Sequence, residues 1–442
     1  MSDRASQWEE TPSWSVSAAS ELRRTPATVA PIVYPPEERV GDDFHLWDTW
    51  LLRERDGTLA TPGGVRVVFA LTAPDDLLPG KRHDAARIRC LYSRDGRRWH
   101  DAGPVFEPAA ALGSRQWAGC ALYEPDGESQ GALTLYYTAA GDRDETELSY
   151  TQRIAVATGG RLAVTDGDFD VTRSWDHETL LRPDGTRYET ETQSRGMIYT
   201  FRDPWFFEDP ATGETHLLFE ANTPVPAASA PCGGDEEARS FNGCVGIATS
   251  DGGVTDFELG SPIFHAACVN QELERPHLVV QDGRYYLFVS SHDHTFAPGF
   301  DGFDGLYGFV ADDLRGEYRP LNDTGLVVTN PANAPYQTYS WLAYPHESEL
   351  LVTSFFNYYD LQGRSLDDVA GLSPTEQFRR FGGTLAPTLR VGLDGDRSRL
   401  RGTLDHGHLP LPSESLPEPA EPAARRPAYG GAPTVLGDGG EE

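Results

Sequence analysis

The stretch "RVVFALTA", residues 66–73, is a short run rich in β-branched and aromatic residues, and four similar runs follow it along the chain. They are "LTLYYTAA" (133–140), "HLLFEANT" (216–223), "YYLFVSSH" (285–292) and "LLVTSFFN" (350–357). Runs of this length and composition, bounded by Gly, Asp and Pro, are typical of β-strands, whereas helical periodicity is scarce in this chain. A strand that recurs about every 65 to 85 residues indicates a repeat architecture.

Each repeat contains more than one strand. A second apolar run follows each of the first four, namely "RIRCLYS" (87–93), "RIAVAT" (153–158), "CVGIATS" (244–250) and "GLYGFVAD" (305–312), and the looser "FGGTLAPTLRVGL" (381–393) follows the fifth. Units of several short strands arranged radially form propeller blades, which protect their sheet edges and leave a central channel. We therefore predict an all-β fold, a five-bladed β-propeller with a central axial active-site pocket. A sandwich of two sheets is the alternative.

The two ends of the chain differ from this repeating pattern. Residues 1–40 are rich in Pro and Ser, and we expect them to wrap the propeller without forming a domain of their own. The propeller catalytic domain is predicted over residues 41–408. Residues 409–442 consist largely of Pro, Gly, Ala and acids with little to bury, and are predicted to be a disordered tail or a loose wrap.

The charge of the chain is strongly negative. Its 442 residues include 68 acids and 37 bases, a net charge of −31, and the single lysine is Lys81. Nucleic-acid binding depends on neutralising phosphates with Lys and Arg, so this composition argues against nucleic acid and also against anionic membranes. Because the acids are spread along the whole chain, we interpret them as a salt-adapted surface; an acidic face for a cationic partner is the alternative. No apolar run approaches a membrane span, and the N-terminus lacks the pattern of a secretory signal.

Five cysteines are present, at Cys90, Cys120, Cys232, Cys244 and Cys268. They form no CxxC pair and no Cys/His metal spacing, and their odd number leaves at least one thiol unpaired. Cys232 and Cys244 flank a polar loop and could pair, but the favoured interpretation is that the cysteines serve as small buried apolar residues.

A polar or aromatic cluster lies shortly before each of the five runs. The clusters are "WDTW" (47–50), "QWAG" (116–119), "RDPW" (202–205), "ELERP" (272–276) and "TYSW" (338–341). Taken singly, each is more typical of a core strand, a structural turn or a solvated surface. In a propeller, however, the first strand of every blade lines the axis. Matching positions in five blades would direct one residue each at a central pocket: Asp48, Trp117, Asp203, Glu274 and Tyr339.

The residue types in these clusters favour sugar chemistry. Retaining transfer needs two carboxyls about 5 to 5.5 Å apart, one to attack the anomeric carbon and one to protonate the leaving oxygen. Glu272 and Glu274 share a face of a strand, and adjacent like charges favour protonation of one of them; Arg275 would point to the other face unless the backbone bends. Arg202 and Asp203 offer a donor and an acceptor for sugar hydroxyls. A catalytically inactive sugar-binding propeller is the alternative.

The clusters and runs together resemble the levansucrase and inulosucrase family, glycoside hydrolase family 68. The motifs "WDTW", "QWAG", "FRDPWFFED", "FEANT", "ELERP", "GLYGF", "LNDTGLV" and "TYSW" follow the order of that family, and the resemblance covers residues 35–395. It implies a five-bladed propeller that passes a fructosyl unit from sucrose, through a covalent enzyme intermediate, to water, sucrose or a growing fructan, with release of glucose. No cofactor is expected.

The resemblance also implies roles for single residues. Asp48 matches the nucleophile, Glu274 the acid/base and Asp203 the transition-state stabiliser of that family. The sugar-binding and supporting set that it implies is Trp47, Trp117, Arg202, Glu220, Glu272, His292 and Tyr339.

Two positions depart from the family pattern. Ala118 stands where many members have a serine that hydrogen-bonds the nucleophile, so the support of Asp48 is expected to differ. Gln271 stands where calcium-binding members have an aspartate ligand, and we predict no metal. The expected enzyme is a levansucrase that makes β-2,6 fructan; an inulosucrase or a mainly hydrolytic sucrose β-fructofuranosidase are the alternatives. Sucrose and fructan are the expected partners, and the expected location is extracellular, with the cytoplasm as the alternative.

Overall fold

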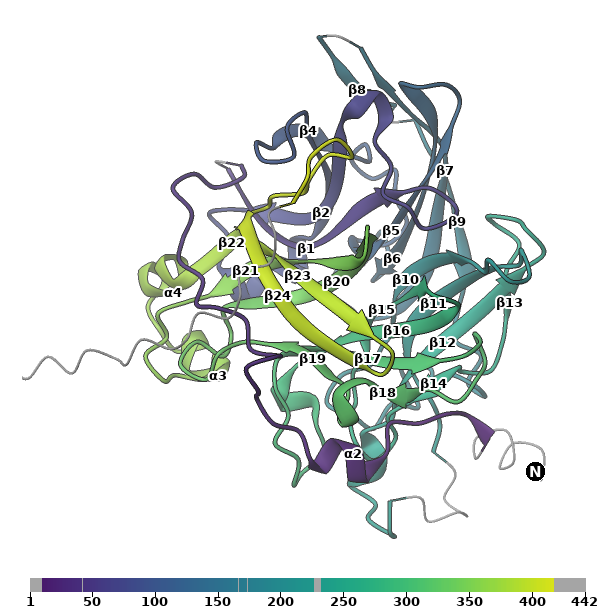
Figure 1. Cartoon of the computed structure of the whole chain (residues 1–442), viewed down its shortest axis with the longest axis vertical. Coiled ribbons are helices and arrows are strands. Elements are labelled where there is room, and N and C mark those ends of the chain that lie inside the picture. The colour runs from purple at the N-terminus through teal and green to yellow at the C-terminus, as the bar shows by residue number, and fades with distance from the viewer. Residues whose placement is uncertain (1–9, 42, 166, 173, 226–231, 417–442) are drawn as a thin grey trace, which may run out of the picture.

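The chain folds into a ring of antiparallel β-sheets. Figure 1 shows it as a computed structural model, which describes residues 10–41, 43–165, 167–172, 174–225 and 232–416. Helices are short and lie outside the sheets; they include α2 (Val16–Ser20), α3 (Leu366–Ala370) and α4 (Pro374–Arg380). Within the described residues, no helix has the length and apolar character that a membrane crossing requires.

The strands group into five blades in chain order. Blade one contains β1 (Phe44–Arg53), β2 (Arg66–Pro74), β3 (Arg87–Ser93) and β4 (His100–Pro104). Blade two contains β5 (Arg115–Pro125), β6 (Gln130–Ala140) and β7 (Gln152–Val164), with β8 (Phe169–Val171) and β9 (Asp176–Leu181) both paired to β7. Blade three contains β10 (Phe201–Glu208), β11 (Thr215–Asn222) and β12 (Gly243–Ser250), with β13 (Glu258–Leu259) and β14 (Phe264–His265) paired to β12.

The last two blades repeat this plan. Blade four contains β15 (Glu274–Gln281), β16 (Arg284–Ser291) and β17 (Gly305–Ala311), with β18 (Arg319–Pro320) and β19 (Leu326–Thr329) paired to β17. Blade five contains β20 (Thr338–His346), β21 (Glu349–Tyr358), β23 (Pro387–Asp394) and β24 (Arg397–His406), and β22 (Phe381–Leu385) pairs with β21 beside β23.

The predicted repeat corresponds to these blades. The five runs that open the repeats are the second strands, β2, β6, β11, β16 and β21, and the apolar runs after the first four are β3, β7, β12 and β17. The looser fifth run is divided into β22 and β23, with Ala386 between them. Pro387 begins β23, at a position where a missing backbone donor is tolerated.

The first strands of the blades close into a ring. Neighbouring members of the series β1, β5, β10, β15 and β20 contact each other, and β20 contacts β1. β1 and β5 also pair in parallel, Leu52 with Ala121 and Arg53 with Leu122. One continuous apolar core runs through all the blades. The five-bladed propeller predicted from the repeats is therefore confirmed, and the two-sheet sandwich is excluded.

The described N-terminal residues, 10–41, run along the outside of blades three to five, where Figure 1 shows them in dark purple. Ser13 forms a bridge with His265 of β14, and Val29 forms one with Thr329 of β19. The buried Trp14 donates a hydrogen bond to the carbonyl of Thr324 at 3.0 Å. These contacts hold the segment against the propeller through backbone pairing and one aromatic anchor.

The start of the predicted tail packs against blade one. The N–H of the buried Leu409 donates to the carbonyl of Gly96 at 2.8 Å, and Arg66 donates from Nε to the carbonyl of Pro410 at 3.0 Å. Glu414 accepts a 2.6 Å hydrogen bond from Arg97. Residues 417–442, where most of the predicted disorder falls, lie outside the described residues.

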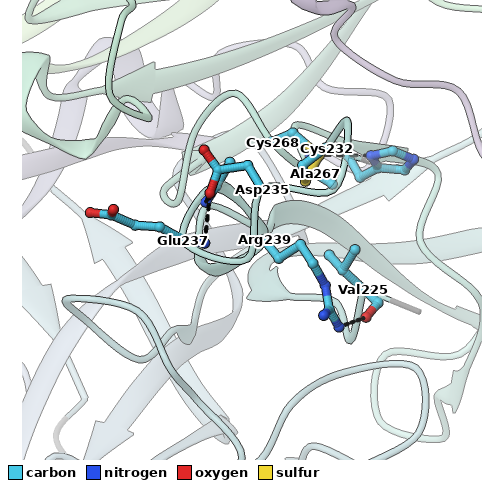
Figure 2. Close-up of a disulfide and its surroundings, with 9 residues drawn as sticks. Val225, Cys232, Asp235, Glu237, Arg239, Ala267 and Cys268 are labelled. Carbon is cyan, nitrogen blue, oxygen red and sulfur yellow. Dashed lines mark hydrogen bonds between the residues drawn. A yellow bond between two sulfur atoms is a disulfide. The ribbon is translucent and has the colours of Figure 1, made fainter. Parts of the chain in front are cut away.

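One disulfide joins Cys232 to Cys268 (Figure 2). The expected role as a small apolar residue is therefore wrong for these two cysteines, and the pairing of Cys232 with Cys244 is excluded. Cys244 lies buried within β12 with a free thiol, as Cys90 and Cys120 do in their strands. The bond links the inserted loop after β11 to the segment that leads into β15. The two cysteines are 36 residues apart in the sequence.

Candidate active site

Every first strand is interrupted by a β-bulge at its sequence cluster. The register shifts lie between Trp47 and Thr49, Trp117 and Gly119, Arg202 and Trp205, Glu274 and His277, and Tyr339 and Leu342. At four bulges one residue has a positive φ: 24° at Asp48, 60° at Asp203, 52° at Arg275 and 59° at Ser340. A bulge redirects side chains out of strict alternation, and non-glycine residues at positive φ concentrate at functional sites. The strands are therefore bent where the candidate residues occur.

The bulges surround a cavity of about 560 Å³ on the propeller axis. We call it the axial cavity. It lies in the size range of small-molecule sites. The predicted residues that line it are Trp47, Asp48, Trp117, Arg202, Asp203, Glu272, Glu274, His292 and Tyr339. The remaining one, Glu220, is fully buried and accepts a hydrogen bond from Arg202 at 2.8 Å, so it supports the wall from behind.

Asp48 faces the cavity as a poorly solvated carboxylate, with its side chain 19% exposed. Burial raises its pKa and the negative charge of Glu274 adds to this rise, while Arg275, at 3.9 Å, and a hydrogen bond with Ser340 oppose it. Ala118, at the bulge of β5, offers no hydroxyl, so the support of Asp48 comes from β15 and β20 instead. Poor solvation together with fixed partners suits a carboxylate nucleophile.

Arg275 links the three carboxylate-bearing strands. The backbone bends at this residue, with φ of 52°, so its guanidinium turns toward Asp48 instead of pointing away from it. Its side chain donates to the hydroxyl of Ser340 at 2.9 Å and to the carbonyl of Thr49 at 3.0 Å. Its backbone N–H donates to Asp203 at 3.2 Å. One residue thus fixes the relative positions of the two aspartates.

Asp203 is buried at the bulge of β10. Its backbone N–H donates to Thr138 at 2.9 Å. Burial raises the pKa of Asp203 to about 6, with Arg202 and Arg275 opposing that rise and Glu274 reinforcing it. Above that pH the carboxylate can accept hydrogen bonds from ligand hydroxyls in the cavity.

Both oxygens of Glu274 are held by neighbours. Arg202 donates from Nη2 to one oxygen at 2.9 Å, and the hydroxyl of Tyr339 donates to the other. The same Nη2 lies 3.1 Å from Glu272. Burial disfavours the charge of Arg202, but the surrounding glutamates outweigh it and raise the pKa of Arg202 well above its ordinary value. The guanidinium therefore remains charged and orients Glu274 at the cavity wall.

Three carboxylates in and behind the cavity wall lie close enough together to be tested as a metal site. Asp203, Glu220 and Glu274 each have an oxygen within 4.8 Å of those of the other two. Arg202 donates to both glutamates, so a guanidinium already supplies the positive charge that a metal ion would bring. Gln271 uses its amide otherwise, accepting from the N–H of Met197 at 3.0 Å and donating to the carbonyl of Ile198 at 2.7 Å. The absence of a metal remains a prediction.

Part of the cavity wall was not predicted from the sequence. The missed lining residues are Arg82, His83, Tyr150, Gln152, Met197, Ile198, Tyr199, His294 and Phe355. Arg82 and His83 belong to a short helical turn, Pro79–Ala85, between β2 and β3. The indole N–H of Trp117 donates to the carbonyl of His83 at 3.1 Å. Most of these residues lie outside the predicted strands, where no repeat marks them. The adjacent basic residues Arg82 and His83, in a chain with far more acids than bases, were the signal in the sequence that could have indicated a functional position.

A family model described as Levansucrase/Invertase matches residues 1–410. The chain belongs to that family, glycoside hydrolase family 68. The match spans the propeller and the N-terminal segment and agrees with the resemblance drawn from the motifs.

Relatives in the same family cover nearly all of the chain. A levansucrase, LscA, of Pseudomonas savastanoi pv. glycinea is 36% identical, with 90% of this chain and 96% of the relative covered. An extracellular sucrase of Zymomonas mobilis is 33% identical, covering 84% and 87%. Among solved structures, an inulosucrase from Halalkalicoccus jeotgali bound to kestose is 62% identical, with a TM-score of 0.89 and coverage of 92% and 99%.

Proposed function

We propose that this protein is a sucrose-dependent fructosyltransferase that works by double displacement in the axial cavity. The observation that carries the proposal is the presence of Asp48, Asp203 and Glu274 in the wall of one cavity, on three different blades, beside the indoles of Trp47 and Trp117. Two carboxylates, a third that can accept hydrogen bonds from sugar hydroxyls, and flanking aromatic rings are the groups that retaining glycosyl transfer uses. Family membership identifies the glycosyl donor as sucrose.

In the first step, Asp48 attacks the anomeric C2 of the fructosyl unit while Glu274 gives its proton to the glycosidic oxygen. Glucose leaves and the fructosyl unit remains as an ester on Asp48. In the second step, Glu274 takes a proton from the acceptor hydroxyl, which attacks C2 and releases Asp48 as a carboxylate. Two inversions give net retention.

The neighbouring residues have separate tasks in this scheme. Asp203 accepts hydrogen bonds from fructosyl hydroxyls and strengthens them as positive charge develops on the ring. Arg202 and Tyr339 keep the carboxyl of Glu274 directed at the glycosidic oxygen. Arg275 holds Asp48 and Asp203 in register. Trp47 and Trp117 cover the apolar faces of the sugars, as aromatic rings do in carbohydrate sites.

The acceptor decides which product forms. Water gives fructose, sucrose gives short oligosaccharides, and a fructan gives a longer fructan. The curated relatives favour a levansucrase, and the 62% identity to an inulosucrase favours an inulin-type β-2,1 product as the second candidate. We place the reaction outside the cell, on the strength of a relative that is named as an extracellular sucrase.

Incubation with sucrose tests the proposal. The wild-type protein should release glucose, in excess over fructose where transfer prevails and in equal amount where hydrolysis prevails; linkage analysis of the product distinguishes β-2,6 from β-2,1. Glu274→Gln should lose glucose release, whereas the exposed Glu258→Gln, the matched control on β13, should keep it. Wild-type turnover by Glu274→Gln would remove the site assignment, and no turnover by the wild type would favour a sugar-binding propeller.

A further inference from the structure

The connection between β9 and β10 carries part of the wall of the axial cavity. Residues 182–200, all of which the structure describes, contain no helix and no strand. Met197, Ile198 and Tyr199 lie near the end of this connection and line the cavity. Connections of this length without secondary structure are uncommon in compact domains, and many of them have a function. We call residues 197–201, which run into β10, the wall segment.

Side-chain packing holds the outer half of the wall segment only weakly. Met197 is 64% exposed and Ile198 is 39% exposed, so neither side chain gains the free energy that a buried apolar residue gains. A segment with little buried apolar surface opens easily unless its backbone is hydrogen-bonded. The partners of its backbone groups therefore decide whether this part of the wall has a fixed position.

Gln271 binds the backbone of this outer half. Its side-chain carbonyl accepts from the N–H of Met197 at 3.0 Å, and its side-chain N–H donates to the carbonyl of Ile198 at 2.7 Å. An amide carries a donor and an acceptor on one group, so it can bind an N–H and a carbonyl of neighbouring residues together. The glycine before Met197 leaves room for the amide, since a Cβ on Gly196 would overlap Nε2 of Gln271.

Two further amides bind the inner half of the wall segment. Gln152 donates to the carbonyl of Tyr199 at 2.8 Å and accepts from the N–H of Phe201 at 2.9 Å. Asn222 accepts from both the N–H and the hydroxyl of Thr200, at 3.0 and 2.9 Å. Each of the five residues in the segment is therefore hydrogen-bonded to an amide side chain.

The three amides come from different blades and are connected. Gln152 begins β7 in blade two, Asn222 ends β11 in blade three, and Gln271 precedes β15 in blade four. All three residues are buried. Asn222 also donates from its side chain to the backbone carbonyl of Gln271 at 3.1 Å. We call this network of three side chains the amide clamp, and it fixes the wall segment relative to three blades.

The clamp acts on the wall without contacting the reacting atoms. Gln271 does not line the axial cavity, and its two hydrogen bonds lie at the end of the wall segment that is farther along the chain from Arg202 and Asp203. A wall that is ordered before the substrate arrives reduces the entropy that is lost on binding. An interaction that is equal in the bound substrate and in the transition state changes KM and leaves kcat unchanged.

We propose that Gln271 is a positioning residue which, through the amide clamp, orders the wall segment for the binding of sucrose and has no part in the chemical step. The inference rests on the proposed function. It assigns part of the substrate affinity to a buried residue that does not touch the substrate.

Gln271→Met removes both hydrogen bonds and keeps a side chain of similar length and volume. KM for sucrose should rise by about 5- to 30-fold, the factor for one or two neutral hydrogen bonds. The value of kcat for glucose release should stay within about threefold of wild type. Initial rates of glucose release over a range of sucrose concentrations measure both constants, and thermal unfolding checks that the variant is folded.

Gly196→Ala reaches the clamp by a second route that leaves Gln271 unchanged. The backbone accepts alanine because φ is not positive at Gly196, but the new Cβ displaces the amide of Gln271. This variant should therefore raise KM to a similar extent, and it provides the test if Gln271→Met does not fold. Combining the two substitutions should change KM by less than about twofold beyond Gln271→Met alone, since both remove the same hydrogen bonds.

Gln193→Met is the matched control. Gln193 also accepts from a backbone N–H, that of Thr190 at 2.9 Å, and donates to a backbone carbonyl, that of Gly185 at 3.0 Å. Neither Thr190 nor Gly185 lines the axial cavity, so KM should stay within about twofold of wild type.

Hydrogen exchange measures the order of the wall segment itself. In the wild type the N–H of Met197 is bound by Gln271, and in Gln271→Met and Gly196→Ala it should exchange about tenfold faster or more. Mass spectrometry of peptides that cover the wall segment measures the rate. In Gln193→Met the exchange of the same peptides should be unchanged.

The outcomes distinguish this inference from the proposed function. A wild-type KM in folded Gln271→Met or Gly196→Ala would overturn the role of Gln271 while glucose release still supports fructosyl transfer. A fall in kcat as large as the rise in KM would also overturn it, because the clamp would then act on the chemical step. No glucose release by the wild-type protein would overturn the proposed function and this inference together.

Discussion

The bulge divides each first strand into two halves, and these halves differ in backbone geometry, charge and side-chain type. The halves that begin β1, β10, β15 and β20 carry bulges, positive φ angles and buried charges around the axial cavity. The halves that follow the bulges return to a regular ladder, and those of β1, β10 and β20 carry large aromatic side chains. Trp50, Trp205 and Tyr344 are all buried there.

The aromatic half uses polar groups for structure alone. Arg53 places its guanidinium 3.5 Å from the centre of the Trp205 ring and donates to the carbonyl of Phe206 at 2.9 Å. His277 accepts from the N–H of Ala343 at 2.9 Å, and burial lowers its pKa to about 3, so it stays neutral. The aromatic half therefore stabilises the fold. This stability offsets the unfavourable free energy of the strained backbone and the desolvated carboxylates in the other half.

The largest expected effect is on catalysis alone. Asp48→Asn removes the nucleophile, and glucose release from sucrose should fall by about 10⁴-fold or more, since an amide does not form the covalent intermediate. Its free energy of unfolding at pH 7 should not decrease, because burial already disfavours this carboxylate. Enzymatic glucose assay and urea denaturation measure the two quantities. The exposed Asp76→Asn is the control, and an Asp48→Asn enzyme that keeps turning over would break the comparison.

The opposite pattern is expected in the aromatic half. Trp205→Ala leaves a cavity beneath Arg53 and should lower the free energy of unfolding by about 3–5 kcal/mol. Activity per folded molecule should change by less than about threefold, because the side chain does not line the axial cavity. Urea denaturation and kinetics at low temperature measure both. Trp175→Ala, at a half-buried position before β9, should cost less; an equal loss would show that the two regions are not distinct.

The pH dependence of stability should show that ionisation of Asp203 lowers the free energy of unfolding. Its pKa is about 6 when folded and near 3.9 when unfolded, so the folded state binds more protons between these values and stability decreases as pH rises through them. The free energy of unfolding of Asp203→Asn minus that of wild type should therefore increase from pH 4 to pH 7, by on the order of 1–3 kcal/mol. Thermal unfolding at both pH values tests this; an equal difference at the two would contradict it.

The smallest expected effect belongs to neither half. The net charge of −31 is spread over the surface, and salt near 1 M screens its self-repulsion. The melting temperature should rise by a few degrees from low to molar salt, by the same amount in wild type, Asp48→Asn and Trp205→Ala. A melting temperature that does not change with salt would show that the acidic surface is not a salt adaptation. Unequal increases among the three proteins would show that the surface charge acts on one half of the strands more than on the other.

Much of the site was predictable because its residues occupy matching places in a repeat. Asp48, Asp203 and Glu274 each lie on the first strand of a blade, so a periodic pattern and the geometry of a propeller place them at one axis. Arg82 and Met197 line the same cavity from connections that differ between blades, and no local pattern marks such positions. The pairing of Cys232 with Cys268 was missed for the same reason, since the two approach through the insertion after β11.

The amino-acid sequence by itself determined the inner strands, their fivefold recurrence and the first-strand location of the clusters, because alternation, turn residues and spacing act over a few positions. Only the tertiary structure decided that Arg275 turns toward Asp48, that Arg202 bridges Glu220 and Glu274, and that Asp304 meets His292. Those contacts depend on ring closure and on bulges in strands distant in the chain. Whether a buried charge finds a partner is settled by that packing, which no local pattern encodes.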